Sequence, residues 1–232
     1  MSETQVKIKR HINPDDPAFR DLSQLFVKGF FEKWGEEHEP AKIEEFFRWE
    51  QQRLGDNSVF MSASIPSDAG EKVFAFTRAA IIPNVVDRIW EEAAILSQIE
   101  LPQQILRSRA DAMREPPVIS IGRAEALSTA AFDGGMRDGY FGDVVVDRPP
   151  GFRENVTPQL IVETYRQMYR ENQPISLQGI FTHQSVDRLI GGFARSLGGE
   201  CIYPTTDDEV SNPLKVYIAN GNIVKQRISA QK

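Results

Sequence analysis

Cysteine is nearly absent from the chain, and long apolar runs are absent altogether. Cys201 is the single cysteine among 232 residues, so no disulfide can form within the chain, and we expect a cytoplasmic protein. The N-terminal residues, Met-Ser-Glu-Thr-Gln-Val-Lys, lack the apolar core of a secretory signal. Apolar stretches such as Ala79–Pro83 are far shorter than the roughly 20 residues that a bilayer crossing requires. We therefore expect no membrane span.

Positive charge is in deficit. The chain carries 27 Lys and Arg against 33 Asp and Glu, a net charge of −6, so no long-range attraction to nucleic acid or anionic lipid is expected. Hydrophobic residues make up 41% and charged residues 26%, which is ordinary for a globular protein and excludes a disordered or collagen-like chain. The length predicts a single domain over residues 1–232 that can hold an insertion.

The motifs of the common nucleotide, hydrolase and zinc sites are also missing. Gly134 and Gly139 have the spacing of a P-loop, but Tyr-Phe follows them instead of Lys-Ser/Thr. The chain has no Gly-x-Ser-x-Gly elbow, no His-Glu-x-x-His pair and no cysteine cluster. We therefore predict no metal site.

The pattern of apolar residues predicts a mixed α/β chain. In the first half, alternation and helical spacing predict a strand at 6–9, helices from about 19 and 43, and strands at 58–63 and 72–77. The last two strands should form an antiparallel hairpin with a long loop at 66–70, and a helical insertion should fill about 83–135. In the second half we predict a strand at 140–146 buried on both faces, a helix that Thr157 caps, a strand at 174–181, a helix at 184–197 and strands at 201–203 and 214–218.

This order of elements resembles that of the GNAT (Gcn5-related N-acetyltransferase) superfamily. The resemblance is best over residues 140–203, fair over 6–82 and absent over 83–133. It implies a central mixed, mostly antiparallel sheet flanked by helices. It also implies an acyl-CoA-dependent N-acyltransferase that moves an acyl group, as a rule acetyl, to a small-molecule or peptide amine by direct attack.

The resemblance further implies where acetyl-CoA or another acyl-CoA would bind. In the superfamily, a buried strand exposes main-chain groups to the pantetheine arm, and the loop and helix start that follow bind the pyrophosphate, because free amides at a helix N-terminus attract anions. The positions implied here are Val144, Val145, Val146, Arg148, Gly151, Phe152, Arg153, Glu154 and Asn155.

Direct attack on a thioester requires a neutral amine, and hence a proton acceptor near these strands. By location, Asp143 and His183 are the candidates, and Tyr140 could protonate the leaving thiolate. Each also has a structural interpretation: a turn residue for Asp143, a cap for His183 and a packing residue for Tyr140. Phe46 and Phe47 on an early helix could line an acceptor groove or belong to the core.

Departures from the superfamily pattern keep other functions open. The phosphate loop normally reads Arg/Gln-x-x-Gly-x-Gly/Ala, whereas Arg153 occupies the last place here. Asp187 and Ala194 stand where an Asn and a general-acid Tyr are usual. A catalytically decayed binding or regulatory protein on the same scaffold is therefore an alternative. An acyl-carrier protein or aminoacyl-tRNA donor is a weaker one, and the negative net charge disfavours the RNA.

Overall fold

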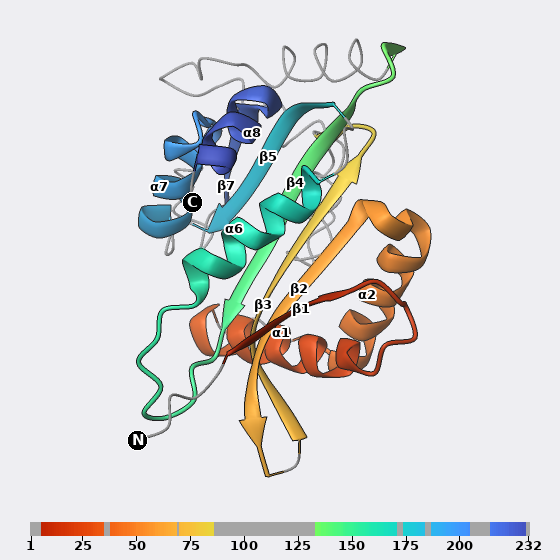
Figure 1. Ribbon diagram of the computed structural model, residues 1–232, viewed down its shortest axis with the longest axis vertical. Helices are drawn as coiled ribbons and strands as arrows, with labels where there is room; N and C mark the ends of the chain where they lie inside the picture. Colours follow the sequence, from red (N-terminus) through yellow and green to blue (C-terminus); the bar gives the residue numbers. More distant parts are fainter. Residues whose placement is uncertain are drawn as a thin grey trace. The chain divides into compact units, whose positions relative to one another are not determined.

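A computed structural model of the chain describes residues 6–34, 38–68, 70–85, 133–170, 174–183, 187–204 and 214–230 (Figure 1). The chain divides into two compact units. Unit 1 comprises Met1–Ala80 and Asp143–Arg170, and unit 2 comprises Ile81–Gly142 and Glu171–Lys232. Most of the helical insertion predicted at 83–135 lies outside the described residues.

Unit 1 is built on antiparallel strands near the N-terminus. Strand β1 (Lys7–His11) pairs with β2 (Ser58–Ser67), from Lys7 opposite Ser64 to His11 opposite Phe60, and β2 pairs with β3 (Gly70–Ile82). The β2–β3 hairpin extends past the end of β1 in Figure 1. The predicted strands and their antiparallel pairing are confirmed.

The hairpin differs from the sequence prediction in its turn. The β2–β3 ladder continues to Ser67 opposite Gly70, so the predicted long loop at 66–70 is wrong, and the turn is tight. Gly70 has a φ of 118°, a conformation that glycine tolerates and side chains resist. Further along, Ala63 pairs with Ala75 but Ser64 pairs with Val73, so Phe74 is an extra residue in β3 and forms a β-bulge.

Helices cover both faces of these strands. On one face, α1 (Ala18–Trp34) and α2 (Pro40–Leu54) bury aromatic rings: the Phe19 ring lies 5.0 Å from that of Phe60, and the Phe47 ring lies 5.2 Å from it. On the other face, α6 (Thr157–Met168) contacts β3 where the Thr164 and Thr77 hydroxyls approach to 2.5 Å. Phe47 is therefore a core residue.

Unit 2 holds the remaining strands. The first part of β4 (Arg137–Val146) pairs in parallel with β5 (Ile175–His183), which is antiparallel to β7 (Leu214–Asn220), and β7 is antiparallel to β6 (Glu200–Pro204). The buried Asp138 carboxylate accepts the amide protons of Val85 and Leu177, at 3.0 and 3.2 Å, and joins these segments. The mixed, mostly antiparallel architecture that the sequence predicted is confirmed.

The helices of unit 2 are α7 (Asp187–Ser196) and α8 (Gly221–Ala230). Helix α7 was predicted, with a start at residue 184, and α8 was not. Along the described parts of the chain, every helix is too short or too polar to cross a membrane.

Three further predictions need correction. Strand β4 is buried on both faces only around Tyr140 and Phe141, because beyond them burial alternates along the strand. Helix α6 includes Thr157, so that its N-cap is Val156 and no side chain caps it. His183 is the last residue of β5 and pairs with Leu214, instead of following the strand.

Candidate functional site

The end of β4 is the segment that the resemblance assigned to the pantetheine arm. Within unit 2, β4 pairs with β5 up to Phe141 opposite Ile180, and in unit 1 the strand continues from Asp143 to Val146. Val145 is buried, and a Cβ added at Gly29 of α1 would lie 2.7 Å from its Cγ1 atom. The valine side chain at position 145 therefore packs against helix α1, and glycine permits this close approach.

The main chain at the end of β4 has a definite orientation. The Asp147 amide donates a hydrogen bond of 2.7 Å to the carbonyl of Phe74 on β3. Within a strand, the N–H and C=O groups of successive residues point alternately to its two edges. The main-chain groups of Val144 and Val146 therefore point to the edge of β4 away from β3.

The loop that follows β4 is held by a few short contacts. The Phe152 amide donates to the carbonyl of Pro149 at 3.1 Å, Gly151 has a φ of 81°, and the Phe152 ring lies 5.1 Å from that of Phe74. The Arg148 guanidinium donates to the side-chain oxygen of Asn155 at 2.9 Å. These contacts form a turn whose base packs on β3.

The loop leads into α6 through an uncapped helix start. Val156 at the N-cap position is buried and offers no side-chain acceptor, and Pro158 occupies the first turn. Arg153, Glu154 and Asn155 are exposed just before it. The structure thus places two arginines and an uncapped helix N-terminus in one short segment, with Glu154 as an opposing charge.

Asp143, the first candidate for proton transfer, belongs to a buried ionic cluster. Its carboxylate accepts the Nε proton of Arg78 at 2.5 Å, and Arg78 also contacts Glu50 at 3.3 Å. The guanidinium carbon lies over the rings of Phe46 and Phe47, 5.2 and 5.7 Å from their centres. The Asp143 carboxylate is therefore engaged by Arg78, and the cluster fixes the end of β4 to β3 and α2.

The other two candidates belong to unit 2. Tyr140 is buried on β4, and His183 ends β5, but the side chain of His183 lies outside the described part of the structure. Within the described ranges, no three His, Cys, Asp or Glu side chains gather as metal ligands would.

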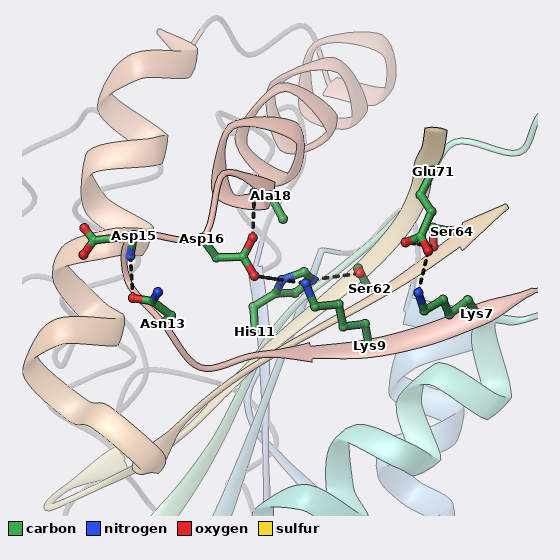
Figure 2. Close-up of polar contacts among 10 residues, drawn as sticks. All are labelled: Lys7, Lys9, His11, Asn13, Asp15, Asp16, Ala18, Ser62, Ser64 and Glu71. Carbon is green, nitrogen blue, oxygen red and sulfur yellow. Dashed lines mark hydrogen bonds and ion pairs between the residues drawn. The ribbon is translucent and has the colours of Figure 1, made fainter. Parts of the chain in front are cut away.

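The sequence prediction missed a second polar cluster, which lies in unit 1 where β1 leads into α1 (Figure 2). His11 Nδ1 lies 2.9 Å from a carboxylate oxygen of Asp16, and His11 Nε2 lies 2.8 Å from the Ser62 hydroxyl. The same Asp16 oxygen accepts a hydrogen bond from Lys9 Nζ at 3.2 Å, and the other Asp16 oxygen accepts one from the Ala18 amide at 2.9 Å. The imidazole therefore bridges a carboxylate and a hydroxyl.

Electrostatics fix the protonation of this cluster. Burial raises the pKa of Asp16, but the hydrogen bonds from His11, Ala18 and Lys9 outweigh it and lower the pKa to about 2. Burial lowers the pKa of His11 below its usual 6.5, against the opposing effect of Asp16. At neutral pH, Asp16 is thus ionised and His11 neutral. Because an ionised carboxylate can only accept hydrogen bonds, His11 Nδ1 carries the ring proton and donates it to the hydrogen bond with Asp16. His11 Nε2 then accepts a hydrogen bond from the Ser62 hydroxyl.

The cluster borders a pocket of about 530 Å³. His11 and Ser62 are 2% and 3% exposed, so they form its buried floor. Charged side chains of both signs line the pocket, among them Lys9, Arg20, Arg48, Asp21 and Glu71. No local sequence pattern marks Ser62, because its partner His11 lies 51 residues away.

Comparison with known proteins supports the fold. No protein-family model matches the chain, and neither does any curated protein. Among solved structures, a protein of Acinetobacter baylyi described as a candidate acetyltransferase matches with a TM-score of 0.51 and 8% identity, over 95% of this chain and 94% of its own. The C-terminal condensation domain of Ebony, solved with beta-alanyl-dopamine, matches with a TM-score of 0.51 and 6% identity, over 94% and 100%.

A third structure, the mosquito arylalkylamine N-acetyltransferase-like protein 5b, has a TM-score of 0.48 and 12% identity, over 92% of this chain and 100% of its own. Identities this low show a shared fold and leave activity to be argued from the site. From the two likenesses with a TM-score of 0.51, we conclude that this chain shares the fold of these two proteins, and the mixed α/β fold that its element order predicted is confirmed.

Proposed function

We propose that this protein transfers an acyl group from acyl-CoA to an amine. The observation that carries the proposal is the end of β4, where the main-chain groups of Val144 and Val146 point away from β3 and the strand leads towards the N-terminus of α6, which no N-cap side chain caps. The shared fold supports the same conclusion. One of the matched domains holds beta-alanyl-dopamine, an N-acylated amine.

The residues from Val144 to Asn155 would hold the acyl-CoA. The main-chain groups of Val144 and Val146 point away from β3 and would hydrogen-bond the pantetheine amides, whereas Val145 fixes the strand against α1. Arg148 and Arg153, with the amides at the start of α6, would receive the pyrophosphate. Gly151 and Phe152 shape the turn, and Glu154 must point outward from the anion.

In the reaction, the amine nitrogen attacks the thioester carbonyl carbon. A C–N bond forms, the C–S bond breaks, the amine loses a proton to a base, and the thiolate takes up a proton. The Arg78 ion pair makes Asp143 the weaker of the two candidate bases, so we assign the base to His183 and a positioning role to Asp143. Tyr140 is the candidate acid.

Calorimetric titration with acetyl-CoA tests the binding step. We expect binding at micromolar concentrations and a loss of about tenfold or more in affinity for Arg153→Ala, since a hydrogen bond to a charged group contributes about 1.5–3 kcal/mol. Arg170→Ala is the matched control, because Arg170 is exposed near the other end of α6. If acetyl-CoA and longer acyl-CoAs give no heat at high micromolar concentration, the proposal fails.

Mass spectrometry of amine acceptors tests the chemical step. Arylalkylamines and peptides with free N-termini are incubated with acetyl-CoA, and acetylated product is measured. His183→Gln should lower kcat and leave acetyl-CoA affinity unchanged, and Tyr140→Phe should have a smaller effect of the same kind. Acetyl-CoA binding without any product across the panel would instead favour the binding or regulatory alternative.

A further inference from the structure

The cluster of Ser62, His11 and Asp16 has the connectivity of an activated serine. The hydroxyl, the imidazole and the carboxylate lie in sequence at 2.8 and 2.9 Å, and the carboxylate is ionised. In this order the imidazole can take the hydroxyl proton, while the carboxylate holds the ring orientation and stabilises the cation that forms. The arrangement stands in unit 1, on β1, β2 and the segment before α1.

The strand register places a cation beside the serine. Lys9 is directly opposite Ser62 in the antiparallel β1–β2 pair, so the two side chains share one face of the sheet, with their Cβ atoms about 5 Å apart. The Lys9 ammonium already reaches Asp16 in the same cluster, and it lines the pocket. It is placed to stabilise negative charge that develops on a carbonyl oxygen near Ser62.

We propose that this pocket is an esterase-like site, in which Ser62 is the nucleophile, His11 the general base and Asp16 its orienting carboxylate. The substrate class is a short-chain ester of a polar alcohol. The pocket volume of about 530 Å³ accommodates a small molecule, and its wall carries both positive and negative side chains. This site is separate from the β4 segment that the proposed acyl transfer uses, so each can fail without the other.

The reaction balances with water as the second reactant. Ser62 Oγ forms a bond to the ester carbonyl carbon as its proton passes to His11 Nε2, and the ester C–O bond breaks with that proton transferred to the leaving alcohol. Water then attacks the acyl-serine, its proton passes to His11, and the proton returns to Ser62 Oγ as the carboxylic acid leaves.

A small fluorophosphonate and 4-nitrophenyl acetate are the probes. Intact-mass spectrometry should show one phosphonyl adduct on the full chain, mapped to Ser62 after proteolysis, and Ser62→Ala should abolish it. The matched control is Ser58→Ala, which changes another buried serine of β2 that is not part of the pocket lining. This control should label at the wild-type rate.

His11→Gln should slow labelling and ester hydrolysis by about 100-fold or more, as the loss of a general base does. The wild-type rate should rise with pH and reach half of its maximum below pH 6.5, because burial lowers the pKa of His11 below that value. Folding of each variant is checked by circular dichroism. A folded wild-type protein that is not labelled at Ser62, or labelling that survives in Ser62→Ala, would overturn the proposal.

Discussion

Two strand-to-helix connections in unit 1 treat the helix N-terminus in opposite ways. Before α1, the Asp16 carboxylate accepts the Ala18 amide and thereby caps the helix with a negative charge. Before α6, the N-cap is Val156, whose side chain makes no capping hydrogen bond. The positive end of the α1 dipole thus faces an acid of the chain itself, whereas we propose that the start of α6 receives an external anion. The comparison therefore sets a carboxylate of the chain at one helix start against a proposed phosphate site at the other.

The largest expected effect concerns the ion pairs of Arg78, which hold the end of β4 just before the connection to α6. Arg78→Met should lower the free energy of unfolding by about 3–5 kcal/mol, because Asp143 and Glu50 would remain buried without their cation. Urea unfolding measures the loss. The control replaces Arg78, Asp143 and Glu50 together by apolar residues, which should recover most of the stability. An unchanged midpoint in Arg78→Met would show that the cluster does not anchor β4.

The next largest effect concerns the close contact between Gly29 of α1 and Val145 of β4. Gly29→Ala should cost about 1–3 kcal/mol, because the new methyl group would meet Val145 Cγ1 at 2.7 Å. Gly192→Ala on α7 is the matched control: its Cβ meets nothing within 4 Å, so it should be neutral or stabilising. Thermal unfolding of both variants tests this, and equal effects would contradict the close packing.

Removing the Asp16 carboxylate, which caps α1, should lower the free energy of unfolding by about 1 kcal/mol, the usual contribution of an N-cap. Asp16→Ala makes this change, and Asp15→Ala, its exposed neighbour, is the control. The pKa of Asp16 is about 2 in the folded protein against 3.8 for an ordinary aspartate. Its stabilisation is therefore complete above about pH 4 and is lost as the pH falls towards 2.

His11 adds a second step to the pH dependence of wild-type stability. Burial lowers its pKa in the folded state, so the unfolded chain takes up the proton first, and stability declines as the pH falls below 6.5 towards the folded value. Urea midpoints from pH 8 to pH 2 should show both declines. In Asp16→Ala the step between pH 4 and pH 2 should be smaller. An identical profile in the two proteins would contradict the assigned cap.

The smallest expected effect comes from placing a carboxylate before α6, as Asp16 already stands before α1. Asn155→Asp places a carboxylate just before the uncapped helix and should stabilise the fold by about 0.3–1 kcal/mol. It should also weaken acetyl-CoA binding, since the acid competes with phosphate for the same field. Added salt should diminish both changes. Tighter acetyl-CoA binding in this variant would argue against a phosphate site here.

The sequence predicted most elements because their signals are local. Apolar periodicity identified α1 and α2, and the alternation of apolar and polar residues identified β1. Helix α8 was missed because Gly221 at its start and a weak apolar stripe do not resemble a helix, and the hairpin turn was overestimated because Pro66 suggested a loop where the ladder continues.

The candidate sites differ in predictability for a related reason. The segment after β4 is contiguous, so a resemblance of order could locate it. The cluster at the pocket requires a contact between His11 and Ser62. That contact depends on the β1–β2 register, which is a long-range property. Nothing near Ser62 in the sequence distinguishes it from the serines at positions 58 and 64.

The extra residue in β3 has a consequence for how this region tolerates change in length. Because Phe74 is inserted, Val73 returns to the face that Ser64 occupies, while Phe74 itself reaches Phe152 and its carbonyl receives the Asp147 amide. Deleting Phe74 would leave Val73 opposite Ser64 in a regular ladder and so keep the pocket wall, whereas the loop after β4 would lose its contact with the Phe74 ring.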